Sequence, residues 1–170
     1  MGSSHSGDDR AATAAEYEAL CRSYDRRTQA RQISADDALA QRDAGAPIIW
    51  IDTRSAAEHA VSSIPRSRLH EVALPRLLLG TAMSGAAESL HAISTDATII
   101  CACTAGLRSG WAAVELEKRL GRRVYSLHGG IVAWANAGGE VTRCGVVTDR
   151  VHTCSAQWGR FLFDGRTAVW

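Results

Sequence analysis

The chain has 170 residues, a formal net charge of +1, 46% hydrophobic residues and 22% charged residues. This length is enough for one domain with extensions, whose core needs no covalent staples. The near-neutral charge gives no sign of a nucleic-acid or membrane partner. No apolar run approaches the roughly 20 residues of a membrane span, so an integral membrane protein is not expected.

The termini and cysteines indicate a cytoplasmic protein. The first residues are small, polar and acidic, which fits neither a secretory signal nor a transit peptide. The chain has five cysteines, an odd number at irregular spacing, which argues against a disulfide framework. They are Cys21, Cys101, Cys103, Cys144 and Cys154.

The N-terminal part is predicted to contain one helix outside the main domain. Residues 1–10 are polar and are expected to be disordered. Residues 11–31 are rich in Ala and Arg, and their apolar side chains form a single stripe at helical spacing. We therefore expect an N-terminal helical extension over 11–31.

The segment 32–139 alternates helical patterns with apolar runs, which predicts an α/β domain with a largely parallel sheet. Ser34 followed by Asp37 is typical of a capped helix start. The expected strands are 47–51, 71–74, 98–102 and 123–127. The expected helices are 35–43, 55–61, 76–80, 86–93, one that ends before Gly121 and one that runs through Trp134.

Three segments with chemistry-bearing residues follow predicted strands. They contain Asp52, Cys103 and the run 128–130, which reads His-Gly-Gly. Ligands in parallel sheets bind outside the carboxyl ends of the strands. We therefore expect these segments to meet on one face.

The segment between the strand at 98–102 and the following helix carries the strongest chemical signal. Cys103 begins a short loop that contains Gly106 and Arg108 and enters the helix N-terminus. Unpaired N–H groups and the positive end of the helix dipole favour an anion at this position. The same field favours thiolate over thiol, so Cys103 is a candidate nucleophile.

The C-terminal segment 140–170 is predicted to be an extension of the domain. Two β-prone runs flank Asp164-Gly165, which is a two-residue hairpin signal and predicts a hairpin over 161–170. An isolated hairpin is marginal in water. Its apolar side chains should therefore pack on the domain or on a second subunit; they are Phe161, Phe163, Val169 and Trp170.

Taken together, the motifs of 32–139 resemble the rhodanese-like sulfurtransferases. The resemblance rests on four segments in the same order as in that family. They are Trp50-Ile51-Asp52-Thr53-Arg54 with Glu58 after it, Ile64-Pro65, the cysteine loop 103–109, and Leu127-His128-Gly129-Gly130-Ile131-Val132-Ala133-Trp134.

The resemblance implies a doubly wound domain with a central five-stranded parallel sheet flanked by helices. It also implies that Cys103 carries sulfane sulfur as a persulfide in ping-pong kinetics, from a small anionic donor such as thiosulfate to cyanide, a thiol or a protein. No metal or organic cofactor is required. The donor would bind to the loop residues Thr104, Ala105, Gly106, Leu107, Arg108 and Ser109.

Some residues near the loop have structural interpretations. Arg108 could pair with a sulfonate donor, or instead with a helix acid. Asp52 and Arg54 could support the site, or be structural, with Arg54 paired to Glu58. The sequence departs from the usual family pattern around Ile64-Pro65, where it has Ser62-Ser63 before and Arg66-Ser67 after.

The remaining cysteines leave two further hypotheses. Cys101, Cys103, Cys144, Cys154 and His152 could form a metal set on paper, but alternate strand residues point to opposite faces and the spacing matches no common zinc pattern. Cys144 or Cys154 could serve as a resolving thiol if the tail lies near the site.

Other activities remain as alternatives. In phosphatase loops five residues separate Cys and Arg, whereas here the residues from Thr104 to Leu107 separate Cys103 from Arg108. The shorter loop disfavours phosphatase activity but leaves arsenate reduction open. A non-catalytic interaction or regulatory module is the other alternative, and the two extensions could also form the contact of a homodimer.

Overall fold

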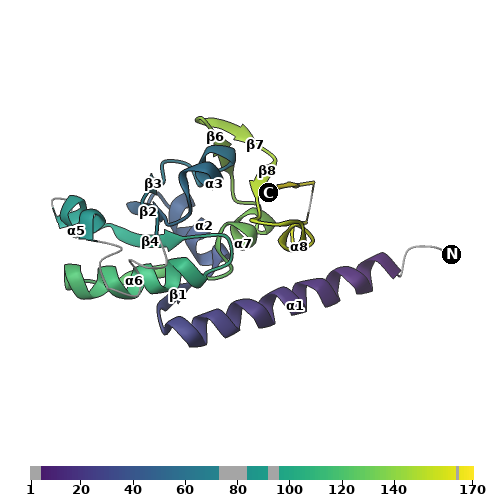
Figure 1. Ribbon diagram of the computed structural model, residues 1–170, viewed down its shortest axis with the longest axis horizontal. Coiled ribbons are helices and arrows are strands. Elements are labelled where there is room, and N and C mark those ends of the chain that lie inside the picture. Colours follow the sequence, from purple (N-terminus) through teal and green to yellow (C-terminus); the bar gives the residue numbers. More distant parts are fainter. Residues whose placement is uncertain (1–4, 73–83, 92–95, 164) are drawn as a thin grey trace.

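A five-stranded sheet forms the centre of the domain (Figure 1). The computed structural model describes residues 5–72, 84–91, 96–163 and 165–170. All pairings in the sheet are parallel, in the order β1-β5-β4-β2-β3. This confirms the predicted fold class. The strands are β1 (Arg31–Ile33), β2 (Ile48–Asp52), β3 (Arg68–Leu69), β4 (Thr98–Ala102) and β5 (Val124–Leu127).

Helices cover both faces of this sheet, as the alternation of elements predicts. One face packs against α5 (Ser84–His91) and α6 (Leu107–Leu120). The other packs against α2 (Ala35–Asp43) and α7 (Gly130–Asn136). The short helix α3 (Ala56–Val61) follows β2. None of the helices in the described ranges is long and apolar enough to cross a membrane.

Alternating side chains of the two central strands build the two layers of the core. Ile99 and Cys101 of β4 face the α5–α6 layer, whereas Ile100 and Ala102 face the α2–α7 layer. In the second layer the indole of Trp50 packs edge-on against Trp134, with ring centroids 5.0 Å apart. This is the period-two alternation of a strand buried on both faces.

The predicted helix starts are present, and one strand is shifted. Ser34 Oγ accepts the N–H of Asp37, and Ser55 and Glu58 form a full capping box at the start of α3. The strand expected at 71–74 instead forms at Arg68–Leu69, beside the end of β2. Residues 73–74 and the helix expected at 76–80 lie outside the described residues.

The N-terminal helix α1 (His5–Thr28) both begins and ends earlier than the predicted range 11–31, and Arg31 instead begins β1, a strand that the sequence did not predict. Residues 5–10, predicted to be disordered, continue the helix, and residues 1–4 lie outside the described residues. The Arg10 guanidinium lies 4.9 Å from the Phe163 ring, so the tail gives this early part of the helix a tertiary partner. In Figure 1, α1 runs beside the domain and its N-terminal end projects beyond the short helix α8.

The C-terminal extension contains a β-hairpin, but not at the predicted place. The hairpin joins β6 (Val141–Arg143) to β7 (Val146–Thr148) through Cys144-Gly145. The later strands β8 (Arg150–His152) and β9 (Thr167–Val169) pair in parallel, and α8 (Ala156–Gly159) lies between them. The hairpin predicted over 161–170 is therefore wrong, because β9 takes β8 as its partner.

Residues 161–163 are held by a helix rather than by a strand. The Asn136 side chain donates to the carbonyl of Phe161 and accepts the N–H of Phe163, at 2.7 and 2.9 Å. These contacts use the backbone groups that a hairpin would need. The Phe161 side chain is 2% exposed and packs on the domain as expected, whereas Trp170 is 65% exposed.

The unusual serine pair attaches the extension to the domain. Ser63 and Thr142 exchange two backbone hydrogen bonds of 2.9 and 2.8 Å. Ser62 Oγ accepts the backbone N–H of His152 at 3.0 Å. The residues that depart from the family pattern therefore hold β6 and β8 in place.

A buried ion pair fixes the chain after β2. Arg54 donates to Asp52 through Nε and Nη2 and to the Ser62 carbonyl, and both charged side chains are at most 3% exposed. The expected pairing of Arg54 with Glu58 does not form. Asp52 and Arg54 are thus structural, and they hold the segment that carries α3.

We expect Asp52→Asn to destabilise the protein by about 3 kcal/mol, because it leaves the buried Arg54 guanidinium without its counter-charge. Asp43→Asn is the matched control. It removes a carboxylate from an exposed pair with Arg42 and should cost less than about 1 kcal/mol. Chemical denaturation of both variants measures the difference, and equal losses would contradict the structural role of the buried pair.

Candidate active site

The sulfur of Cys103 lies inside the loop that joins β4 to α6. The side chain is 2% exposed, and Sγ accepts the backbone N–H of Gly106 at 3.2 Å. Gly106 is the N-cap of α6, with φ +104°. The sulfur therefore lies at a helix N-terminus, where N–H groups and the helix dipole stabilise negative charge.

A pair of buried hydroxyls lies behind the sulfur. Ser109 Oγ is 3.5 Å from Cys103 Sγ, 3.2 Å from the Gly106 carbonyl and 3.0 Å from Ser126 Oγ. A hydroxyl has one proton to donate. If Ser126 donates to Ser109, the single Ser109 proton is shared between the Gly106 carbonyl and the Cys103 sulfur. Ser109 therefore contacts the nucleophile from its buried side rather than facing a substrate.

Backbone N–H groups at the start of α7 bind the carbonyls of the cysteine loop. The N–H groups of Ile131 and Val132 donate to the carbonyls of Cys103 and Thr104 at 2.8 and 3.4 Å. Gly130 has φ +55°, and a Cβ there would collide with the Cys103 carbonyl and the Thr104 backbone. Only glycine permits this approach. The segment 128–130 thus meets the cysteine loop, as the strand ends predicted.

The outer edge of the loop carries a tight ion pair. Arg108 donates to both Glu58 oxygens at 2.8 and 2.7 Å and to Thr104 Oγ1 at 3.3 Å. Although burial opposes its ionisation, hydrogen bonds from Arg108 and from the backbone of Ser55 hold the pKa of Glu58 well below its usual range. In this structure the Arg108 guanidinium therefore binds the carboxylate of Glu58 on α3 and is not open to an anionic sulfur donor.

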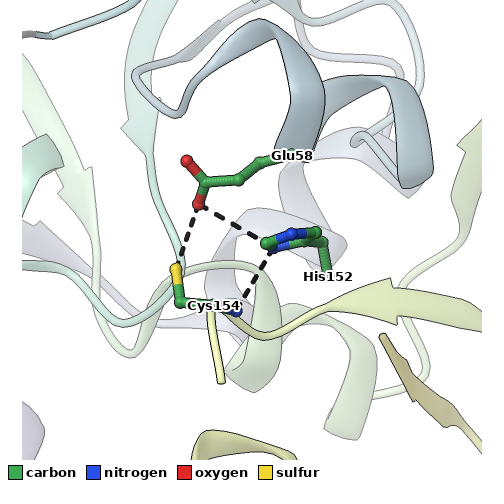
Figure 2. A group of neighbouring side chains, drawn as sticks. All are labelled: Glu58, His152 and Cys154. Atoms are coloured by element: carbon green, nitrogen blue, oxygen red, sulfur yellow. Dashed lines mark hydrogen bonds and ion pairs between the residues drawn. The ribbon is translucent and has the colours of Figure 1, made fainter. Parts of the chain in front are cut away.

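The tail adds a second cysteine to this edge. Cys154 Sγ lies 3.0 Å from Thr104 Oγ1 and 3.1 Å from Glu58 Oε1. The His152 ring accepts the Cys154 backbone N–H at 3.2 Å (Figure 2). Burial first, and then Glu58, raise the pKa of the Cys154 thiol, whereas burial lowers the pKa of His152. The structure thus places one of the two suggested tail thiols beside the cysteine loop.

Glu58, His152 and Cys154 also form a group of potential metal ligands. Their donor atoms all lie within 4.8 Å of one another. However, the Arg108 guanidinium already pairs with Glu58 and lies 3.6 Å from Cys154 Sγ. A cation there would have to displace this charge, so the donor set does not favour a metal.

Helix α1 closes the opposite side of the loop. Tyr17 donates its hydroxyl to the Gly129 carbonyl at 2.6 Å, and Tyr17 and Cys21 form an apolar cluster with Ala105 and Phe161. Burial raises the pKa of the Cys21 thiol to about 12 and that of Tyr17 well above its usual value. Both groups are therefore neutral covering residues near the nucleophile.

His128 ties α1 to the end of β5. Its ring nitrogens lie 2.7 Å from Asp25 and 2.8 Å from Glu18, both on α1. Although burial opposes protonation, hydrogen bonds to Glu18 and Asp25 raise the pKa of His128. The ring thus lies between two carboxylates of α1, and in its protonated form it donates to both and helps to dock the helix.

The predicted loop residues thus have different positions. Gly106 and Ser109 contact the sulfur, Thr104 and Arg108 form the edge, Ala105 packs under α1, and Leu107 begins α6. Sequence reasoning did not place Glu58, Ser126 or Tyr17 beside the loop, although Glu58 stood in a motif that it had identified. It named His152 only as a member of a metal set that the spacing disfavoured.

Comparison with known proteins agrees with this architecture. A buried thiol between a parallel strand and a helix N-terminus defines an α/β protein with a cysteine loop. A family model described as a rhodanese-like domain matches residues 34–137, which is more than half of the chain. The chain therefore belongs to the rhodanese-like domain family.

Two groups of relatives illustrate the match. The chain is 34% identical over 114 residues to a tRNA uridine(34) hydroxylase from Xanthomonas oryzae pv. oryzae, covering 65% of this chain and 43% of that protein. A protein of the same name from Xanthomonas euvesicatoria pv. vesicatoria is 33% identical over 114 residues. The chain thus spans less than half the length of these relatives.

Solved structures show the same fold. A thiosulfate sulfurtransferase from Pseudomonas aeruginosa superposes with a TM-score of 0.55 at 22% identity, over 75% of this chain and 23% of that one. The rhodanese-like domain of an Anabaena protein gives a TM-score of 0.53 at 18% identity, over 65% and 77% of the two chains. At these identities the likeness concerns the fold.

We expect Gly130→Ala to cost about 3 kcal/mol or more, since it adds a backbone collision to a strained φ. Gly138→Ala is the control: Gly138 also has a positive φ, +85°, but a Cβ there meets nothing within 4 Å. Its cost should be the strain alone, of order 1 kcal/mol. Thermal unfolding of both variants tests this, and similar losses would contradict the support of the loop by α7.

The docking of α1 should weaken as pH rises. Because the folded-state pKa of His128 is raised above 6.5, its stabilising contribution is complete below about pH 6.5 and is lost as pH rises through the raised pKa. We expect the melting temperature of His128→Gln to lie below that of the parent at pH 5.5 and to approach it at high pH. A constant difference across the pH range would contradict this linkage.

Proposed function

We propose that the protein is a sulfurtransferase that carries sulfane sulfur on Cys103 as a persulfide. The observation that carries this proposal is the position of Cys103 Sγ, which accepts the Gly106 N–H and lies beside the Ser109 hydroxyl at the N-terminus of α6. These groups are fixed before any substrate binds. They stabilise a thiolate without reorganisation.

The same groups support both halves of a ping-pong reaction. With thiosulfate, the Cys103 thiolate attacks the outer sulfur, the S–S bond of the donor breaks, and sulfite leaves. With cyanide as acceptor, carbon attacks the outer sulfur of the persulfide, thiocyanate leaves, and the Cys103 thiolate returns to its place in the loop. Neither half needs a metal or an organic cofactor.

The ion pair between Arg108 and Glu58 affects which sulfur donor the site can bind. Glu58 neutralises Arg108, so a doubly charged donor would have to compete with a bidentate carboxylate for the guanidinium. A persulfide on a small thiol or on a protein can deliver sulfur without using this fork. We therefore place a thiol persulfide ahead of thiosulfate as the natural donor.

The curated relatives favour a second candidate, a role in the modification of tRNA. The supporting observation is the 34% identity over 114 residues to a tRNA uridine(34) hydroxylase. This chain spans only 43% of that protein, so the hydroxylase activity belongs to a longer chain. Specific binding of the protein to tRNA over other RNA in a filter assay would favour this second candidate.

Incubation with a sulfane donor should add one sulfur atom to Cys103, detected by intact-mass and peptide mass spectrometry. Cys103→Ser should abolish both this gain and the release of thiocyanate, because the variant hydroxyl cannot form a persulfide. Cys144→Ser is the matched control, since Cys144 lies in the β6–β7 hairpin, and it should behave like the parent. Sulfur uptake that persists in Cys103→Ser would contradict the proposed function.

A further inference from the structure

We propose that Cys154 is a second sulfur carrier, which takes the sulfane sulfur from the Cys103 persulfide and presents it to thiol acceptors in solvent. This inference rests on the proposed function of Cys103. It gives the C-terminal extension a catalytic role and assigns one of its cysteines to the outer edge of the site.

The first argument is the position of Cys154 on the nucleophile loop. Its sulfur lies 3.0 Å from the hydroxyl of Thr104, the residue directly after Cys103, and 3.6 Å from Nη2 of Arg108. Both contacts are made to residues of the same loop that holds the Cys103 sulfur. A persulfide places the transferable sulfur about 2 Å beyond Cys103 Sγ.

The second argument is access. Cys103 is 2% exposed, and α1 covers one side of its loop through Tyr17. Cys154 is exposed to solvent although its sulfur is hydrogen-bonded within the site. An acceptor thiol carried on a peptide or protein therefore meets the exposed Cys154 before the buried Cys103. Cys154 supplies the position that such an acceptor can reach.

The other cysteines do not share this position. Cys21 and Cys101 are fully buried and offer no sulfur to an acceptor in solvent. Cys144 is exposed at the turn of the β6–β7 hairpin. In the part of the chain that the structure describes, Cys154 thus combines exposure with contact to the cysteine loop.

The tail holds Cys154 in place. The preceding residue, Thr153, is fully buried and donates its N–H to the carbonyl of Val169 on β9 at 2.8 Å. His152 receives the N–H of Cys154 and is itself bound through its own N–H to Ser62. The parallel pairing of β8 with β9 therefore fixes the thiol at the edge of the loop.

The transfer step balances without an external oxidant or reductant. The Cys154 thiolate, formed when the thiol loses its proton to solvent, attacks the outer sulfur of the protonated Cys103 persulfide, and a new S–S bond forms on Cys154. The old S–S bond breaks, and its electron pair remains on Cys103, which leaves as a thiolate held by the Gly106 N–H. The transferred sulfur keeps its own proton, and the proton that the resting Cys154 thiol donates to Glu58 is the one released to solvent.

A single-turnover experiment on the full chain tests the proposal. The protein is mixed with less than one equivalent of thiosulfate, quenched with an alkylating reagent at increasing times, and digested for peptide mass spectrometry. The extra sulfur should appear first on Cys103 and then on Cys154. Cys154→Ser should keep the sulfur on Cys103, and its release to glutathione should fall by about tenfold or more relative to release to cyanide.

Two controls complete the design. Cys144→Ser, the matched exposed cysteine, should pass sulfur from Cys103 to Cys154 as the parent does. Cys103→Ser should leave Cys154 without sulfur. Retention of sulfur on Cys103 in Cys154→Ser also reports that this variant is folded, and Cys154→Ala provides a second test of the same position.

The contrary outcomes separate the two proposals. Sulfur on Cys103 but never on Cys154 would overturn the relay and leave the proposed function of Cys103 intact. Equal loading of Cys154 in Cys103→Ser would overturn both, because Cys103 would then not be the required carrier. A chain in which neither cysteine takes up sulfur would overturn the proposed function and the relay with it.

Discussion

The close approach of α7 to the cysteine loop is the constraint on which the site depends. The loop must curve around a buried sulfur, and its carbonyls would be unpaired there without the N–H groups of Ile131 and Val132. That contact requires Gly130, whose missing side chain leaves room for the Cys103 carbonyl. The sheet serves this arrangement, since parallel pairing of β4 with β5 brings the two segments to the same edge. Helix α1 then uses the same turn, through the Gly129 carbonyl and His128, to cover the site.

Glu58 organises the outer edge in a comparable way. Its carboxylate receives the backbone of its own helix at Ser55, the guanidinium of α6 through Arg108, and the thiol of the tail through Cys154. One buried acid thus joins three segments that are far apart in the chain. It also sets the electrostatics, because a neutralised Arg108 offers an incoming anion much less than an open fork would. This neutralised edge is the basis for the proposed preference for sulfur carried on a thiol.

The sequence predicted the parts of this structure that have local signals. Capping residues such as Ser34 and the apolar run of β4 marked elements, and the strand ends located Cys103 and the turn at 128–130. Pairings between distant segments were harder. Arg54 and Glu58 have helical spacing, yet Arg54 precedes the cap of α3, and Glu58 turns back to the N–H of Ser55, which aims it at Arg108. Likewise Asp164-Gly165 has the sequence of a hairpin turn, but β9 pairs in parallel with β8 instead of with the residues just before this turn.

The least expected result connects a departure from the family pattern to the site. Ser62-Ser63 replaces the pair that usually precedes Ile-Pro, and these serines bind Thr142 and His152 of the extension. The anchoring of β8 at Ser62 places Cys154 two residues after His152, at the edge of the cysteine loop. A substitution that looked like a local change in a turn is thus the attachment point of a segment that reaches the nucleophile. The extension and the serine pair are best understood as one structural unit, which adds a thiol to an otherwise ordinary rhodanese-like domain.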